Sequence, residues 1–344
     1  MFSFSARAAL LLAMLVLIAC SETSNPTQPD ATGAPAFAVA AASNTWTAKA
    51  PPPYNQFIFG YELGMAPNSS GRSIVYAFGG TSSDEGGTGL NVKAYKLATN
   101  AWSARVSRVF VWNSNGVGKI GNLLYFSGGY NGSEPGAASN ALWAYDYSND
   151  RMIQRANLPI FSAEGVTGVI SGKLYVLPGA CSGNGYPNPG YCAVEETRRF
   201  YRYDPATNAW VTRPQAPHFH RNGAAGVIDG KLYVAGGLAN SGNTPVTALD
   251  VYDPGTKTWR TRASLPLGGA ANGAVINGRF YVVVSHYNGT QNTFDRSLYS
   301  YNPATNAWTA RAAPSFFGSV TRVELDGRSY LFMAGGNKSA LYTP

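Results

Sequence analysis

The sequence is poor in charged residues and in cysteine, and what it lacks excludes several common protein classes. Only 13% of its 344 residues are charged, and three are cysteine. The formal charge is +8, but no block of five or more Lys or Arg occurs, so the positive charge forms no concentrated nucleic-acid-binding patch. No long amphipathic helical pattern is present, and we expect no nucleic-acid partner.

Chemistry-bearing motifs are equally scarce. No Gly-x-Ser-x-Gly nucleophile elbow and no phosphate-binding loop stands in a fitting strand-to-helix context. His218 and His220 form the best fragment of a metal site, but two imidazoles by themselves do not make one. Because a metal site needs several converging ligands, we predict neither a metal nor another cofactor.

Glycine, tyrosine and proline are abundant, with 39, 21 and 21 residues, which is typical of short strands joined by turns. One short segment recurs along the chain, and in each copy a Tyr and the last residue flank a tight Pro/Thr/Asn-type turn. This arrangement predicts a β-hairpin. The copies are Tyr203–Trp210, Tyr252–Trp259, Tyr301–Trp308, the looser Tyr95–Trp102 and the degenerate Tyr145–Met152.

A second pair of strands is predicted between successive hairpins. In Gly226–Gly237 an apolar strand ends at the turn Asp229-Gly230, and the next strand ends in a Gly-Gly doublet. Each unit therefore holds four strands, a to d, in which strand b ends at the doublet, strand c ends at Tyr and strand d carries Trp. Units of this kind, spaced by roughly 50 residues, indicate a repeat architecture.

The order Gly-Gly, Tyr and Trp at this period resembles the kelch motif. The resemblance implies an all-β fold, a six-bladed kelch-type β-propeller over residues 44–344 with four-stranded blades around a central channel. Three units depart from the pattern, with Met152 in place of Trp, Pro178-Gly179 in place of the doublet, and no doublet in the fifth unit. The chain stops after the c strand of Tyr342, whereas Ser43–Trp46 matches a d strand. We therefore predict that residues 44–49 complete the last blade and close the ring.

The first 20 residues predict an export signal, because Arg7 precedes the apolar run Ala8–Ala19. The run ends at Cys20 in a segment that resembles a bacterial lipobox, which implies a signal peptide over residues 1–20 and lipidation of Cys20. An ordinary secretory signal cut near Ala19 is the alternative. Residues 21–43 are rich in Ser, Thr, Pro and Ala and favour a flexible tether. We predict an exported protein, either at the outer membrane through its lipid anchor alone or in the periplasm or at the cell surface.

Export bears on the two remaining cysteines. With Cys20 lipidated, Cys181 and Cys192 are the only pair, and an oxidising compartment favours a disulfide between them. Two free thiols are the alternative.

Loop lengths favour one face of the predicted propeller as the binding surface. The b–c and d–a connections of an up-and-down blade share a face, and the predicted b–c loops are long, which is where binding usually lies on a rigid scaffold. His286–Asp295 is one of these predicted loops. Candidate ligand-binding residues at the channel mouth and on this face are Trp112, Asn113, Glu164, His220, Arg221, Asn222 and His286.

Functions of three classes fit these residues. We favour a monomeric, non-enzymatic binding module for a glycan or an envelope protein, with no catalytic residue assigned. The alternative is a periplasmic sugar isomerase or mutarotase that uses Glu164, Arg221 and His220, because the exported bacterial propellers that the sequence resembles include sialic-acid epimerases. A structural member of an envelope complex is the third. Polar groups converging in a deep channel mouth would favour an enzyme, and a broad aromatic surface would favour binding.

Overall fold

The computed structural model describes residues 43–53, 59–68, 70–81, 90–131, 137–180, 198–239 and 244–344. The chain divides into two compact units, Met1–Ala40 and Ala41–Pro344, and the described residues all belong to the second. The predicted signal peptide, Cys20, nearly all of the predicted tether, and Cys181 and Cys192 lie outside them. Within the described ranges, no helix has the length and apolar character that crossing a membrane requires.

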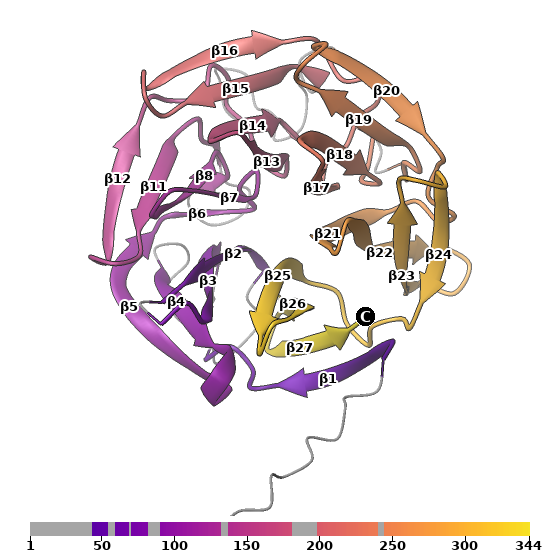
Figure 1. Ribbon diagram of the computed structural model, residues 1–344, viewed down its shortest axis with the longest axis horizontal. Helices are drawn as coiled ribbons and strands as arrows, with labels where there is room; N and C mark the ends of the chain where they lie inside the picture. Colours follow the sequence, from indigo (N-terminus) through magenta and orange to yellow (C-terminus); the bar gives the residue numbers. More distant parts are fainter. Residues whose placement is uncertain are drawn as a thin grey trace, which may run out of the picture. The chain divides into compact units, whose positions relative to one another are not determined.

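The second unit contains six antiparallel four-stranded sheets, here called blades 1 to 6 (Figure 1). A seventh, small sheet has three strands, β6 (Val111–Trp112), β9 (Tyr130–Asn131) and β10 (Ala137–Ala138). The all-β propeller predicted from the repeats is therefore confirmed. Blade 1 consists of β2 (Phe59–Pro67), β3 (Ser73–Thr81), β4 (Leu90–Lys96) and β5 (Ala101–Val109). Blade 2 consists of β7 (Val117–Ile120), β8 (Leu123–Ser127), β11 (Leu142–Asp146) and β12 (Arg151–Arg155). Blade 3 consists of β13 (Val166–Ile170), β14 (Lys173–Leu177), β15 (Phe200–Asp204) and β16 (Ala209–Arg213). Blade 1 also carries the 3-10 turn η1 (Leu97–Thr99) between β4 and β5.

Blades 4 to 6 follow the same order of strands from the inside outwards. Blade 4 consists of β17 (Ala224–Ile228), β18 (Lys231–Ala235), β19 (Leu249–Asp253) and β20 (Thr258–Arg262). Blade 5 consists of β21 (Ala270–Ile276), β22 (Arg279–Asn288), β23 (Thr293–Asn302) and β24 (Ala307–Arg311). Blade 6 consists of β25 (Ser319–Leu325), β26 (Arg328–Gly335), β27 (Lys338–Thr343) and β1 (Thr45–Lys49). The innermost strand of each blade contacts the innermost strand of the next, in the order β2, β7, β13, β17, β21, β25 and back to β2. These six strands enclose a central channel (Figure 1).

The predicted ring closure is confirmed. Strand β1 pairs antiparallel with β27, with Thr45 opposite Thr343 and Lys49 opposite Ser339. The N-terminal strand thus covers the edge that the last blade would otherwise expose. Its position beside the C-terminal strand is visible in Figure 1.

The hydrophobic core lies between adjacent blades. Tyr61 of blade 1, for example, shares one buried cluster with Tyr330 and Phe332 of blade 6. The rings of Tyr95 and Phe332 stack across that junction with centroids 4.6 Å apart. Large aromatic side chains therefore stabilise the contacts between sheets, as the repeat pattern indicates.

The repeated Tyr, Asn and Trp residues connect each blade to the preceding one through a single backbone residue. At the junction of blades 2 and 3, the N–H of Ala156 donates to Asn208 Oδ1 at 2.9 Å, and its carbonyl accepts from Trp210 Nε1 at 2.8 Å. The hydroxyl of Tyr203 also donates to Asn208 Oδ1, at 2.7 Å. Asn208 adopts φ 52°, a left-handed conformation that Asn tolerates well. The same arrangement recurs around Ala50 (Tyr95, Asn100, Trp102), Ala263 (Tyr301, Asn306, Trp308) and Ala312 (Tyr342, Asn44, Trp46).

Two junctions depart from this rule. In blade 4 the Asn position is occupied by Lys257, and the backbone residue that it would hold is Pro214, which has no N–H to donate. Trp259 Nε1 still donates to the carbonyl of Pro214 at 2.8 Å, but the buried hydroxyl of Tyr252 has no hydrogen-bond partner. In blade 2, Asp150 accepts from Tyr145, and Met152 replaces the indole.

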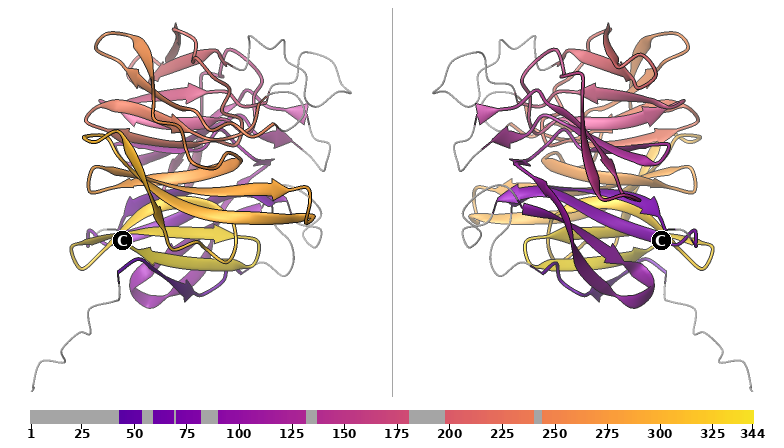
Figure 2. Two further views of the ribbon diagram at one scale, coloured as in Figure 1. Left: turned by 90° about the vertical axis from the view of Figure 1, so that its right-hand side faces the viewer. Right: turned by 90° about the vertical axis from the view of Figure 1, so that its left-hand side faces the viewer.

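One predicted loop is wrong. Residues 286–295 were expected to form a long b–c loop, but β22 and β23 continue through them, with His286 opposite Asp295. Only residues 289–292 form the turn between the two strands. This hairpin projects beyond neighbouring strands in the side views of Figure 2. The strands extend because their residues pair along the full length, so that backbone groups are satisfied without a loop.

Candidate binding site at the channel mouth

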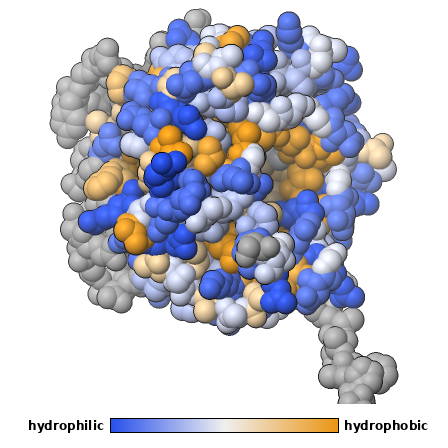
Figure 3. All heavy atoms as spheres, turned by 60° about the vertical axis from the view of Figure 1, so that its left-hand side comes forward, coloured by the Kyte–Doolittle hydropathy of each residue, from blue (hydrophilic) through white to orange (hydrophobic). Residues whose placement is uncertain are grey.

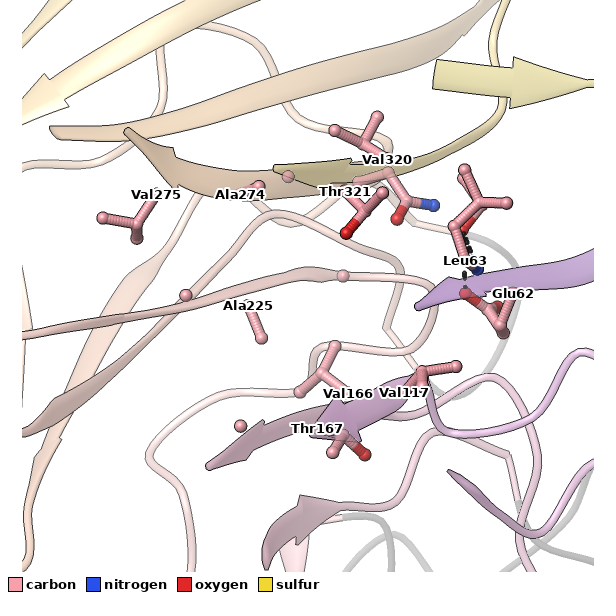
Figure 4. A pocket seen from close by; sticks show the side chains of 18 of the residues that line it. Glu62, Leu63, Val117, Val166, Thr167, Ala225, Ala274, Val275, Val320 and Thr321 are labelled. Atoms are coloured by element: carbon pink, nitrogen blue, oxygen red, sulfur yellow. Dashed lines mark hydrogen bonds between the residues drawn. The ribbon is translucent and has the colours of Figure 1, made fainter. Parts of the chain in front are cut away.

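The six innermost strands line a cavity of 320 Å³ along the channel (Figure 4). A second cavity of 290 Å³ lies at the end of the channel where the a strands begin and strand β26 ends. The two cavities share lining residues, so the second forms a mouth to the first. The shared residues are Glu62, Asn222, Ala271, Asn272 and Ser319.

Amide side chains dominate the polar part of the mouth. Asn113, Asn222 and Asn272 come from the entries to blades 2, 4 and 5, and Phe317 and Tyr61 line the same cavity. An amide offers both donors and an acceptor, so three of them can contact a ligand that has several hydroxyl groups. This convergence brings together residues that are more than a hundred positions apart in the sequence.

Backbone hydrogen bonds run from blade to blade around this mouth. The N–H of Glu164 donates to the carbonyl of Asn113 at 2.8 Å, and the N–H of Asn222 donates to the carbonyl of Glu164 at 2.7 Å. The N–H of Ala271 continues the series to the carbonyl of Asn222 at 2.7 Å. Asn113, Glu164 and Asn222 all have positive φ, near 50°. The mouth is therefore held in place by the scaffold before any ligand arrives.

Glu164 and Arg221 form an ion pair beside the mouth. Arg221 Nη1 lies 2.8 Å from Glu164 Oε2, and the side chains are 17% and 11% exposed. Asn113 Nδ2 donates to the other carboxylate oxygen at 3.2 Å. Among the described lining residues of both cavities, neither Glu164 nor Arg221 occurs. The pair therefore lies behind Asn113 and restrains its amide.

His220 lies inside blade 4, away from the channel lining. Its side chain is buried, Nδ1 donates to the carbonyl of Gly236 at 2.8 Å, and Nε2 lies 3.1 Å from Asp250 Oδ2. His218 also contacts Asp250, through Nδ1 at 2.9 Å, so both imidazoles of the His218–His220 fragment meet one carboxylate. Burial by itself would raise the pKa of Asp250, but hydrogen bonds from His220, Thr261 and His218 outweigh it and keep the pKa below its usual range.

Trp112 and His286 complete the predicted set. Trp112 is buried in the small sheet, where its ring centroid lies 4.7 Å from that of Tyr130. His286 lies on strand β22, and its Nδ1 donates to the carbonyl of Gly268 at 2.8 Å. The structure thus places Asn113 and Asn222 in the mouth, with Glu164 and Arg221 next to it. In the described part of the chain, no cluster of His, Cys, Asp and Glu side chains suited to a metal ion occurs.

Glu62 is the candidate residue that the sequence did not reveal. It lies on the innermost strand of blade 1, where Figure 4 labels it, and the lining of both cavities includes it. Ser319 Oγ donates to Glu62 Oε2 at 3.1 Å and accepts from the N–H of Leu63 at 3.1 Å. Burial raises the pKa of Glu62 to about 7, although the hydrogen bond from Ser319 opposes the shift. A lone acid in the largely apolar segment Phe59–Pro67 was the signal available in the sequence.

Six four-stranded sheets arranged around a central channel define a β-propeller. Residues 221–266 match the family model of the Kelch motif. The repeat match and the fold are those of a kelch-type β-propeller.

Two known proteins show the extent of the similarity. A 145-residue stretch, 38% of this chain, is 30% identical to the human "Kelch repeat and BTB domain-containing protein 12". The chain spans only 22% of that relative's length. The solved structure of YjhT is similar in fold, with a TM-score of 0.59 at 15% identity, over 84% of this chain and 99% of that one. At that identity the likeness concerns the fold alone.

Proposed function

We propose that the protein is a binding module whose ligand enters the channel mouth, and that this ligand is a small hydroxylated molecule such as a sugar. The observation that supports the proposal is the convergence of Asn113, Asn222 and Asn272 with Glu62 and Ser319 on one cavity. The cavities of 290 and 320 Å³ lie near the lower limit of ligand pockets, about 300 Å³, which suits one ring rather than a long chain.

The chemistry of the lining also supports a hydroxylated ligand. A hydroxyl group both donates and accepts hydrogen bonds, and so do the amides and Ser319, whereas Phe317 offers an apolar surface for one face of a ring. As part of the same proposal, the protein is a monomer exported to the bacterial envelope and lipid-anchored at Cys20. A protein partner on the long-loop face is the other ligand class that the sequence suggested.

One observation favours a second candidate, an acid–base enzyme such as a sugar isomerase or mutarotase. A carboxyl with a pKa of about 7 can both donate and accept a proton at neutral pH. In this candidate Glu62, which lines the cavity, would be the acid–base residue in place of the buried His220. Glu164 and Arg221 would position Asn113 rather than contact the substrate.

The binding proposal is tested by titrating the full chain with a panel of neutral and anionic sugars, using thermal shift and calorimetry. Asn222→Ala and Asn272→Ala should each weaken binding of a positive sugar by roughly 3- to 10-fold, because each removes a hydrogen bond worth about 1 kcal/mol. Asn122→Ala is the control, since Asn122 is exposed in the turn between β7 and β8, outside the lining of both cavities. No shift with any sugar, or equal loss in the control, would contradict the proposal.

The enzyme candidate needs a separate measurement on the same sugars. Exchange spectroscopy by NMR would follow the interconversion of anomers or epimers with and without the protein. Glu62→Gln should retain binding yet slow the catalysed interconversion by at least roughly 100-fold, as expected for loss of an acid–base group. Binding without any catalysed interconversion in the unmodified protein would leave the binding module and reject the enzyme.

A further inference from the structure

The junction between blades 1 and 2 contains a largely apolar pocket beside Met152, the residue that replaces the Trp of the other d strands. The pocket has a volume of 370 Å³, and its apolar lining includes Val109, Phe110, Val111, Trp143 and Met152. These residues belong to the end of β5, the segment up to β6, and strands β11 and β12. It is separate from the channel, because none of its described lining residues is among those of either channel cavity.

The repeat departs from its pattern at this junction. In the other five blades the d strand carries a Trp, and its Nε1 donates to a backbone carbonyl of the preceding blade. That carbonyl belongs to the residue four positions after the Trp or Met in the d strand of the preceding blade. Met152 occupies that position in blade 2, opposite Tyr145 in the same register as Trp210 opposite Tyr203. The corresponding backbone residue, Val106, is 85% exposed. Met152 carries no ring, and its side chain lines the open pocket next to Trp143.

We propose that this inter-blade pocket binds a free, planar aromatic molecule of about the size of indole. The pocket is larger than the apolar cavity of about 150 Å³ that suffices to bind benzene in another protein. Trp143 offers an aromatic surface for stacking, and the thioether of Met152 makes favourable contacts with aromatic rings. The polar part of the lining consists of Arg108, Asn131 and Ser139, and the last two can accept from an indole N–H.

Access from solvent does not require the blades to separate. Phe110 is 62% exposed while it lines the pocket, which places the pocket at the surface. Figure 3 brings this side of the molecule forward and shows hydrophobic surface in a hollow between hydrophilic edges. A flexible Met at the wall can adjust to ligands that differ in shape.

Restoring the Trp of the repeat at position 152 provides the test. The full chain with methyl-labelled methionine would be titrated with indole, followed by NMR and calorimetry. The Met152 methyl signal, assigned through Met152→Leu, should shift on titration, and Met152→Leu should retain binding within roughly 3-fold. Met152→Trp should fill the pocket and weaken indole binding by at least 10-fold, without lowering the melting temperature.

Two outcomes would overturn the proposal. One is the absence of any Met152 methyl shift at millimolar indole in the unmodified protein. The other is undiminished binding to folded Met152→Trp protein. If Met152→Trp does not fold, the test rests on the Met152 methyl shift and on indole binding to Met152→Phe, whose smaller ring fills less of the pocket. Sugar binding at the channel mouth should be unchanged by indole, so failure of this proposal and failure of the binding module are distinguishable.

Discussion

Trp210 and Ala156 belong to adjacent blades and are joined by a 2.8 Å hydrogen bond from the indole nitrogen to the backbone carbonyl. The N–H of the same Ala156 is held by Asn208, so both polar groups of one backbone residue are satisfied by the next blade. Because this arrangement recurs at four junctions, the repeat residues connect the ring as well as filling its core. Changes at these positions should therefore alter stability rather than ligand binding.

Removing one such connection should cost measurable stability. Asn208→Ala deletes the acceptor for Tyr203 and Ala156 and places Ala at φ 52°, where it is strained. We expect a loss of about 2 kcal/mol in the free energy of unfolding, measured by denaturant titration. Thr207→Ala, in the same exposed turn, should change it by less than about 0.5 kcal/mol. Equal effects of the two substitutions would show that the Asn208 hydrogen bonds contribute nothing.

Adding the missing connection in blade 4 should stabilise the protein. Lys257 has φ 57°, and the hydroxyl of Tyr252 beside it is buried without a partner. Lys257→Asn supplies an acceptor and a residue better suited to that backbone conformation, so we expect a gain of about 1 kcal/mol. Lys257→Ala removes the same charge without an acceptor and should give no gain. A stabilisation of equal size in both variants would assign the effect to the lysine itself.

Loss of the N-terminal strand should open the ring. Deleting residues 43–49 removes the partner of β27 and the hydrogen bond of 2.8 Å from Trp46 to Ala312. The exposed strand edge and lost core contacts should unfold the domain or lower its melting temperature by well over 5 °C in circular dichroism. Replacing residues 36–42 instead serves as the control, since they precede β1. An unchanged melting temperature after the deletion would refute the closure.

The pH dependence of stability should report on Glu62. Its pKa is raised by burial to about 7, above the value of 4.5 for an exposed carboxyl. The folded state therefore binds the proton more tightly than the unfolded state, and the stability associated with it is lost as pH rises from about 4.5 through 7. Glu62→Gln stays neutral and should lose less stability over that window. If the melting temperatures of the two proteins changed equally with pH from 4.5 to 8, the raised pKa of Glu62 would be contradicted.

Most of the fold could be predicted from the sequence because each repeat carries its own local instructions. The spacing from Tyr to Trp and the Asp-Gly type turns determine hairpins through short-range geometry alone. The ring closure could also be predicted, because Ser43–Trp46 matches the d-strand pattern and this pattern can be recognised without knowing which strand pairs with it. The extension of β22 and β23 was missed, because pairing along His286–Asp295 depends on the two strands meeting rather than on a turn signal.

The repeats alone predict a ring of four-stranded units and mark the residues that define each unit. Which polar groups meet depends on the tertiary structure. It enclosed His220 against Asp250, placed Glu164 and Arg221 behind the mouth, and put Glu62 in the channel. The physical reason is that burial and the resulting pKa depend on side chains from blades distant in the chain, and no local pattern records which of them converge.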